Sequence, residues 1–334
     1  MLLVDSLYIN NSGGFRLLMY LITELQRREV DFYLLADDRC MGQFDKCQHV
    51  NYMKASLWKR KRFYREKENC FSSVLCFGNI PAPIRLGVPV YTYFHNINLL
   101  TLSEAHNSKE KFIMWLKREV FKHYKNHTDY WLVQTDNTAA ELCCHLREDN
   151  KKIRVLPFFE LPASLKSVSN MQHGDDYVYI STYTGAKGHE ELLEAWRLLH
   201  KRGLEKTLHL TVPDTASDFC KKLEVAKDEG VNVINHGFVP FEKVIELYSL
   251  SKAIIYPSHN ESLGLGLIES IEAGCDVLAS DLPFTHCICK PSVVFNPYIP
   301  EAIAEAVEKY ETGNIEKSHI IISDKINELV GMII

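Results

Sequence analysis

Residues 254–281 read IIYPSHNESLGLGLIESIEAGCDVLASD, and this stretch decides the fold. The apolar run at 252–257 predicts a buried strand, and the polar, glycine-containing residues 258–264 predict a loop. Residues 265–274 predict a helix with a glycine at its C-terminal end, and residues 276–281 predict the next strand. A strand, a helix and a second strand in this order form a β-α-β unit, which belongs in a parallel sheet.

The same alternation runs through the rest of the chain. Further strands are predicted at residues 1–8, 30–37, 72–79, 88–96, 129–135, 153–157, 177–183, 207–213, 231–237 and 292–297. Further helices are predicted at residues 15–28, 109–125, 137–146, 189–203 and 241–251. Such alternation is typical of parallel sheets covered by helices. We therefore predict the α/β class, with two Rossmann-like, doubly wound domains that face a central cleft.

A change in composition sets the domain boundaries. Residues 159–176 lose periodicity and gain Pro, Ser, Gly and Asn, which is typical of a linker. We therefore predict an N-terminal domain at 1–158, a linker at 159–176 and a C-terminal domain at 177–310. Residues 311–334 are predicted to form a C-terminal helix that can return to the first domain.

Composition limits the class of protein. The 334 residues are 46% hydrophobic and 24% charged, which is typical of a globular chain long enough for two cores. No apolar run reaches the ~18 residues of a membrane span, and Asp5 interrupts the N-terminal apolar segment where a signal peptide stays apolar. The ten cysteines form no C-x-x-C pair, so we expect reduced thiols and a cytoplasmic protein.

Charge divides the chain unevenly. Residues 1–158 carry 23 Lys and Arg against 17 Asp and Glu, whereas the remainder carries 15 against 26. Seven basic residues lie in the run KASLWKRKRFYREK at 54–67, together with Trp58, Phe63 and Tyr64. Basic side chains mixed with aromatic rings suit an anionic membrane surface, and a solvated helix face or a nucleic-acid site are the alternatives. We favour the membrane over nucleic acid, through Lys59, Arg60, Lys61 and Arg62.

Two glutamates frame the glycines of the opening stretch. The start of a helix offers free backbone N–H groups and the positive end of the helix dipole, which suits a phosphate or diphosphate. Glu261 lies in the loop, and Glu269 lies one turn into the helix, where it could accept both hydroxyls of a ribose. Alternatively, Glu269 only complements the helix dipole and Glu261 is a solvated loop residue. Paired carboxylates also occur in glycoside hydrolases, but there both must flank one sugar bond.

This segment resembles the E-x7-E signature of retaining glycosyltransferases of family 4, which have the two-domain GT-B fold. KGHEELLEAW at 187–196 resembles the family's lysine-glycine helix start. The runs at 231–258 and 280–307 resemble motif segments that follow later in the family's sequences. The resemblance is therefore strong over about residues 177–307. In the first half it is weaker and rests on NNSGG at 10–14 and on the histidine of YFHN.

The resemblance implies that 1–158 is the acceptor-side domain and 177–310 the nucleotide-sugar-binding domain, and it implies a role for each matching residue. Glu269 would bind the donor ribose, Glu261 the donor sugar and Lys187 the diphosphate, while His95 would contact the transferred sugar. Sugar hydroxyls and the distal phosphate would be held by backbone amides of Ser262, Leu263, Gly264, Leu265 and Gly266. The base would be bordered by Phe238, Val239 and Pro240, and the remaining donor contacts would come from Gly13, Gly14 and Thr182. Simpler alternatives are a solvated Lys187, a core His95 and a merely tight turn at the two glycines.

Two departures from the family pattern matter. The family usually has Gly-Arg five or six residues before the lysine, whereas this chain has Ser181-Thr182, so the diphosphate site lacks a planar, bidentate cation. The usual Pro-Asn-Gly after the interdomain strand is replaced by PFFE at 157–160. Lys187 and the helix start still supply positive potential for the diphosphate.

The resemblance predicts a retaining glycosyltransferase. It would move a hexosyl group from a nucleoside diphosphate sugar to a glycan hydroxyl, and its acceptor would be a lipid-linked intermediate of bacterial surface polysaccharide at the inner face of the cytoplasmic membrane. No metal or other cofactor is expected, because the chain has no D-x-D motif. The alternatives are a catalytically silent nucleotide-sugar-binding protein and a nucleotide-dependent oxidoreductase, although G-x-G-x-x-G is missing after the first strand.

Overall fold

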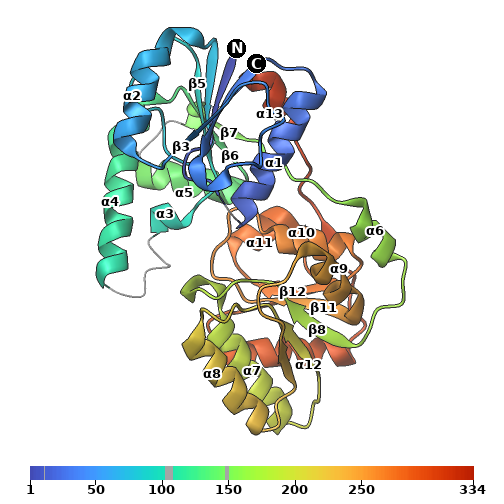
Figure 1. Cartoon of the computed structure of the whole chain (residues 1–334). Coiled ribbons are helices and arrows are strands. Elements are labelled where there is room, and N and C mark those ends of the chain that lie inside the picture. Colours follow the sequence, from blue (N-terminus) through green and yellow to red (C-terminus); the bar gives the residue numbers. More distant parts are fainter. Residues whose placement is uncertain (11, 102–107, 147–149) are drawn as a thin grey trace. The chain divides into compact units, whose positions relative to one another are not determined.

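The chain folds into two compact units, one formed by residues 1–160 and 323–334 and the other by residues 161–322. Each unit is built on a parallel sheet, so the predicted α/β class with two Rossmann-like domains is confirmed (Figure 1). The computed structural model describes residues 1–10, 12–101, 108–146 and 150–334.

The first unit has a seven-stranded parallel sheet in the order β3-β2-β1-β4-β5-β6-β7. The chain starts in the middle of the sheet and reverses its direction of growth between β1 and β4. In α/β sheets ligands bind at such a switch point, beyond the carboxyl ends of the strands. The strands are β1 Leu2–Asp5, β2 Phe32–Asp37, β3 Val50–Met53, β4 Ser73–Cys76, β5 Val90–Phe94, β6 Tyr130–Val133 and β7 Ile153–Val155.

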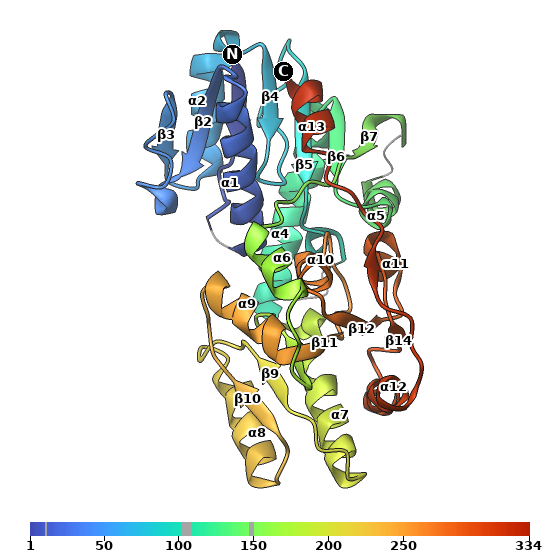
Figure 2. The ribbon, with the colours of Figure 1, turned by 90° about the vertical axis from the view of Figure 1, so that its right-hand side faces the viewer.

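Helices cover both faces of this sheet (Figure 2). The C-terminal helix α13 contacts α1 and β4, and the Ser73 hydroxyl donates to the carbonyl oxygen of Ile333 at 2.6 Å. The last residues of the chain therefore complete the first unit. The helices are α1 Ser12–Arg27, α2 Leu57–Lys67, α3 Asn98–Thr101, α4 Ser108–Tyr124, α5 Asp136–Leu146 and α13 Ile326–Ile333.

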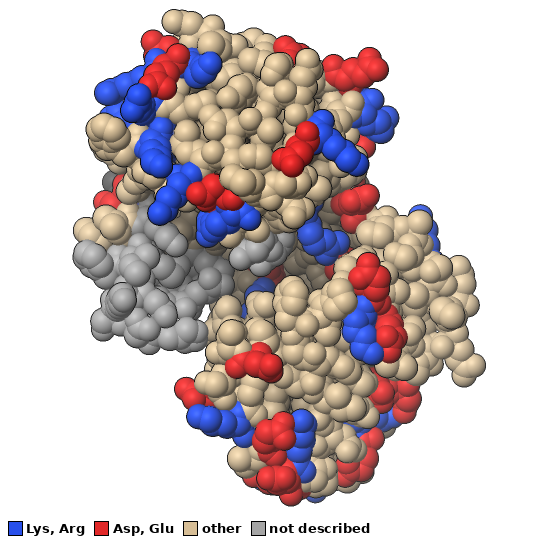
Figure 3. All heavy atoms as spheres, in the orientation of Figure 1, with Lys and Arg blue, Asp and Glu red and all other residues tan. Residues whose placement is uncertain are grey.

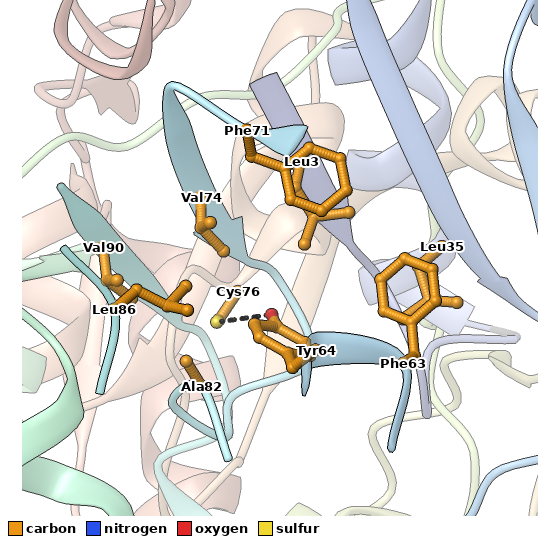
Figure 4. Packing of buried hydrophobic residues seen from close by; sticks show 10 residues of the cluster. All are labelled: Leu3, Leu35, Phe63, Tyr64, Phe71, Val74, Cys76, Ala82, Leu86 and Val90. Carbon is orange, nitrogen blue, oxygen red and sulfur yellow. Dashed lines mark hydrogen bonds between the residues drawn. The ribbon is translucent and has the colours of Figure 1, made fainter. Parts of the chain in front are cut away.

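Part of the first unit's core lies between α2 and the sheet. The α2 residues Phe63 and Tyr64 are 5% and 1% exposed, and they pack with side chains of β1, β2, β4 and β5 (Figure 4). The Tyr64 hydroxyl lies 3.5 Å from the Cys76 sulfur. Figure 4 shows these side chains converging from the helix, the strands and the segments that connect them: Leu3, Leu35, Phe63, Tyr64, Phe71, Val74, Cys76, Ala82, Leu86 and Val90.

Sequence patterns missed the edge strand β3 and the short strands β13 and β15, and they misjudged one turn. The edge strand β3 has only partly buried residues, so its sequence VNYM lacks the apolar alternation of a core strand. Gly13 and Gly14, expected in a turn, lie instead in the first turn of α1. A helix tolerates glycine at its start, because the first turn makes few internal hydrogen bonds.

The second unit has a six-stranded parallel sheet in the order β10-β9-β8-β11-β12-β14. Its strand order matches the first six strands of the other sheet, with the switch point between β8 and β11. The strands are β8 Asp176–Tyr179, β9 Leu208–Leu210, β10 Val233–Asn235, β11 Ser251–Tyr256, β12 Asp276–Ser280 and β14 Val293–Phe295. Short strands β13 Cys289–Lys290 and β15 His319–Ile320 form a separate antiparallel pair.

The helices of the second unit include one in the stretch that composition assigned to a linker. Helix α6 buries Leu165 and Val168 and contacts α9 and α10, so much of residues 159–176 is part of this unit. A seven-residue helix with two buried apolar side chains is too short to show a clear periodicity. The helices are α6 Ala163–Ser169, α7 His189–Lys201, α8 Ser217–Asp228, α9 Phe241–Leu250, α10 Leu265–Glu272, α11 Pro283–Ile288 and α12 Pro300–Thr312.

Candidate functional site

The loop after β11 leads directly into α10 at the switch point of the second sheet. Gly264 caps α10 with φ +61° and ψ +51°, a left-handed conformation that favours glycine. Leu263 is buried and anchors the loop, and Ser280 donates to the carbonyl oxygen of Ser258 at 2.7 Å. The backbone N–H groups at the start of α10 are thus held in place by a fixed loop.

The loop after β8 lies against the loop after β11. A Cβ added at Gly188, which has φ +64°, would lie 2.3 Å from the carbonyl oxygen of Pro257. The N–H of His259 donates to the carbonyl oxygen of Ala186 at 2.8 Å. Only glycine permits this approach, and it brings Lys187 beside the loop that carries Glu261.

Lys187 and Glu261 form an ion pair between these two loops. The Lys187 ammonium donates to Glu261 Oε1, and the Tyr256 hydroxyl donates to the same oxygen at 2.8 Å. The Tyr179 hydroxyl donates to the carbonyl oxygen of Lys187 at 3.0 Å. The side chains of the pair keep 21% and 13% of their exposure, so both groups remain within reach of a ligand.

Burial keeps both tyrosines protonated. It raises the pKa of Tyr179 to about 12, and the Lys187 charge only partly opposes this shift. Burial also raises the pKa of Tyr256 well above its usual value, and the neighbouring Glu261 adds to the shift. Both hydroxyls are therefore donors at neutral pH that orient the ion pair.

Neither tyrosine was predicted as part of the site. Each lies at the last position of a central strand, Tyr179 in β8 and Tyr256 in β11. A tyrosine at the carboxyl end of a strand beside the switch point is a usable signal, because that position faces the ligand-binding edge of the sheet. In the sequence the two tyrosines resemble ordinary core aromatics.

The other predicted donor residues of the second unit lie at the same edge of its sheet. Glu269 is in the second turn of α10 and is 4% exposed. Phe238, Val239 and Pro240 lie between β10 and α9, and Phe238 is 83% exposed. Thr182, in the loop after β8, is exposed and supplies no charge. The roles of these residues stay predictions.

His95 follows β5 of the first unit and is partly buried between aromatic rings. Its ring centroid lies 5.1 Å from that of Phe77 and 5.9 Å from that of Tyr93. A Cβ added at Gly14 would be 3.5 Å from two atoms of this imidazole, so the start of α1 lies against it. Burial lowers the pKa of His95 to about 4, and its Nδ1 has no hydrogen-bond partner among the described residues.

The basic run in α2 is only partly a surface feature. Lys59 and Arg62 are exposed and Lys61 is partly buried, whereas Arg60 is 2% exposed and pairs with Asp5 at 2.7 Å. The assignment of Arg60 to a membrane-binding surface is therefore wrong. The interleaved rings at positions 63 and 64 are buried as well, so Trp58, at 78% exposure, is the aromatic of α2 that faces solvent.

Figure 3 shows Lys and Arg side chains gathered over α2, with acidic side chains among them. The mixture has a local cause, since Arg62 pairs with Glu66 at 2.7 Å. Across the described ranges, no helix is both long and apolar enough to cross a membrane. No group of three His, Cys, Asp or Glu side chains in those ranges could hold a metal ion.

Part of the chain is similar in sequence to known proteins. Residues 166–327 match the family model for glycosyl transferases group 1. The serotype-specific mannosyltransferase WbdA of Escherichia coli is 27% identical over 143 residues, which are 42% of this chain and 18% of WbdA. The chain therefore spans less than a fifth of the length of this curated relative.

Solved structures resemble the whole chain. Sucrose-phosphate synthase from Thermosynechococcus elongatus has a TM-score of 0.69 at 15% identity, covering 93% of this chain and 89% of its own. The lipopolysaccharide outer core galactosyltransferase WaaB scores 0.67 at 12% identity, covering 99% and 94%. Anabaena HepE, in complex with UDP and glucose, scores 0.65 at 15% identity, covering 93% and 90%. These likenesses show the two-domain, Rossmann-like GT-B fold.

Proposed function

We propose that this chain is a glycosyltransferase that moves a hexosyl group from a nucleoside diphosphate sugar to a glycan hydroxyl. The observation that carries the proposal is the Lys187–Glu261 pair beside the glycine-capped start of α10, at the switch point of the second sheet. The match to glycosyl transferases group 1 covers nearly all of this unit. Its residues supply both a cation and backbone donors for a diphosphate.

Lys187 would change partners when the donor binds. In the free protein its ammonium neutralises Glu261, whose position is also fixed by Tyr256. A diphosphate carries more charge than one carboxylate and would compete for the ammonium, while the Tyr256 hydroxyl keeps Glu261 oriented toward the sugar. Glu269 would accept the ribose hydroxyls, and the amides from Ser262 to Gly266 would bind sugar hydroxyls and the distal phosphate.

Catalysis would be largely electrostatic. As the bond between the sugar and the phosphate breaks, negative charge grows on the departing diphosphate, and a lysine and N–H donors already in place stabilise it. We propose retention at the anomeric carbon, with the departing phosphate taking the proton of the acceptor hydroxyl. His95, neutral because its pKa is about 4, would contact the transferred sugar.

The acceptor we propose is a lipid-linked glycan of bacterial surface polysaccharide. The relatives WbdA and WaaB are named for serotype-specific mannosyl transfer and for lipopolysaccharide outer core galactosyl transfer. The exposed α2 side chains Trp58, Lys59 and Arg62, with the partly buried Lys61, would bring the protein to an anionic membrane surface, at the cytoplasmic face.

The residue Thr182 supports one alternative function. It stands where the family usually has the arginine that grips the diphosphate, and a protein of this fold without that arginine could bind a nucleotide sugar without transferring it. Turnover distinguishes the two functions, because only a transferase releases a nucleoside diphosphate.

The test is a panel of nucleoside diphosphate sugars, screened first by thermal shift and then by release of the free diphosphate in the presence of glycan acceptors. A ligand at 100 times its Kd should add about 2.7 kcal/mol to the free energy of unfolding. We expect binding and release, and release should persist in excess chelator. Binding without release from any acceptor would favour the silent protein, and activity restored only by a divalent ion would overturn the metal-free proposal.

A further inference from the structure

Arg60 is an arginine buried inside the first unit with every guanidinium nitrogen engaged. Its Nε donates to Asp5 Oδ2 at 2.7 Å, its Nη1 to the carbonyl oxygen of Pro81 at 2.8 Å and its Nη2 to that of Ile80 at 2.9 Å. A buried arginine is costly unless its charge is paired and its donors are satisfied. Here one side chain links α2 to the end of β1 and to the loop after β4.

Asp5 serves the same junction from the other side. Besides Arg60, its carboxylate accepts the Tyr64 hydroxyl at 2.7 Å and the N–H of Leu7 at 3.2 Å. Asp5 is the last residue of β1, so it fixes the first residues of the loop that follows this strand. The buried pair therefore holds both loops of the switch point, the one after β1 and the one after β4.

These two loops contact each other, and the loop after β4 also contacts His95. A Cβ at Gly78 would lie 2.2 Å from the carbonyl oxygen of Leu7, so the loops are in direct contact. The next residue, Asn79, accepts the backbone N–H of His95 on its Oδ1 at 2.8 Å. Asn79 immediately precedes Ile80, whose carbonyl oxygen Arg60 holds.

Both loops carry backbone strain. Tyr8 and Asn79 have φ values of +83° and +66°, which are uncommon for residues other than glycine. Such conformations cost about 1–3 kcal/mol each and persist where the surroundings impose them, often at functional sites. The buried pair holds a neighbour of each residue, Leu7 beside Tyr8 and Ile80 beside Asn79, and the N–H of Tyr8 also donates to Asp37 Oδ2 at 3.3 Å.

We infer that Arg60 and Asp5 are positioning residues: through the strained Asn79 loop they fix the backbone and the imidazole of His95. The catalytic part of this inference rests on the proposed function, in which His95 contacts the transferred sugar. Lysine could not replace Arg60, because one ammonium cannot reach a carboxylate and two carbonyl oxygens in the fork geometry of a guanidinium.

The test combines NMR of the His95 imidazole with steady-state kinetics on the full chain. In Arg60→Lys, we expect the His95 ring signals, assigned with His95→Gln, to shift. The kcat should fall about 10- to 100-fold, as expected for a misplaced group, while KM for the nucleotide sugar stays within about twofold. The matched control is Phe63→Leu, one turn along α2, which weakens the same core without donating to the Asn79 loop.

The outcomes separate the inference from the proposed function. A shift of the His95 signals in Arg60→Lys and not in Phe63→Leu supports positioning even if no protein transfers sugar, in which case only the proposed function fails. If Arg60→Lys does not fold, Tyr64→Phe, which leaves Arg60 in place but frees one side of Asp5, should shift the same signals by a smaller amount. His95 signals that match the wild type in the folded variants overturn the inference.

Discussion

Each sheet has an ion pair at its switch point, and the two pairs differ in exposure. In the first unit, Arg60 and Asp5 keep 2% and 1% of their side-chain exposure. In the second unit, Lys187 and Glu261 keep 21% and 13%. Both pairs join segments at the carboxyl end of a central strand, in sheets of the same strand order.

The difference in exposure gives the two ion pairs different roles. The buried pair has protein partners for all three guanidinium nitrogens, so it organises loops and has nothing to exchange with a ligand. The exposed pair can trade its internal contact for a substrate phosphate or hydroxyl. A charged pair at a switch point therefore indicates a binding group only where it stays accessible.

The largest expected effect concerns stability. Asp5→Asn leaves the Arg60 charge buried and uncompensated, so the free energy of unfolding should fall by about 3–5 kcal/mol. Glu261→Gln keeps an acceptor for the Tyr256 hydroxyl and loses a partly exposed ion pair, so the loss should be about 1 kcal/mol. Urea unfolding of both variants measures the difference, and equal losses would remove the distinction between the two pairs.

The next effect concerns donor binding. Glu269→Ala should weaken binding of the free nucleoside diphosphate by at least tenfold, because each charge-assisted hydrogen bond to the ribose contributes ~1.5–3 kcal/mol. Glu261→Gln should lower turnover without weakening that affinity, since its role is at the sugar and its loss leaves Lys187 available for the diphosphate. Isothermal titration with the diphosphate that binds the wild type measures both.

Glu272→Ala is the matched control for this pair of variants. Glu272 lies on the same helix, where Lys166 is its partner at 3.5 Å, and it has no proposed contact with the donor. An affinity loss in Glu272→Ala as large as that in Glu269→Ala would indicate general damage to α10. A matching loss in Glu261→Gln would show that Glu261 is not confined to the sugar.

The sequence predicts the exposed site better than the buried one, for a physical reason. Glu261, Glu269 and the glycines between them lie in one loop and the helix that follows it, so local spacing is enough to nominate them, and the family resemblance nominates Lys187. Arg60, Phe63 and Tyr64 also carry a local signal, because the spacing i, i+3, i+4 puts them on one helix face. Their partner Asp5 lies 55 residues before Arg60, and no local pattern shows that contact.

The third-largest expected effect is a dependence of the free energy of unfolding on pH. The folded pKa of His95, about 4, lies below the ordinary value of 6.5, so between these values the unfolded chain binds a proton that the folded protein does not. Stability is therefore fully present above pH 6.5 and is lost as the pH falls toward 4. His95→Gln should reduce the loss between pH 7 and pH 5 by about 1–2 kcal/mol.

Urea unfolding at both pH values measures this slope. His189 of the second unit contributes with the same sign, because burial and the nearby Lys187 lower its pKa to about 3. Some slope must therefore remain in His95→Gln. A slope equal to that of the wild type would mean that the pKa of His95 is the same in the folded and the unfolded protein.

The smallest expected effect concerns lipid binding by two neighbouring residues of α2 that differ in exposure. Lys59 is exposed and Arg60 is buried, so only Lys59 can sense an anionic lipid surface. A basic residue near such a surface contributes ~1 kcal/mol, and the attraction weakens as salt shortens the screening length. Lys59→Ser should therefore weaken binding to anionic vesicles about fivefold at low salt.

Co-sedimentation with anionic and neutral vesicles measures the binding, and two further variants serve as controls. Arg60→Lys should sediment like the wild type, because a buried cation does not reach lipid. Lys201→Ser, an exposed lysine of the second unit, should do the same if α2 is the docking surface. Equal losses in Lys59→Ser and Lys201→Ser would mean that any exposed lysine contributes. Sedimentation of the wild type with neither vesicle would make α2 a solvated helix face, and a lipid-linked acceptor would then have no support from the first unit.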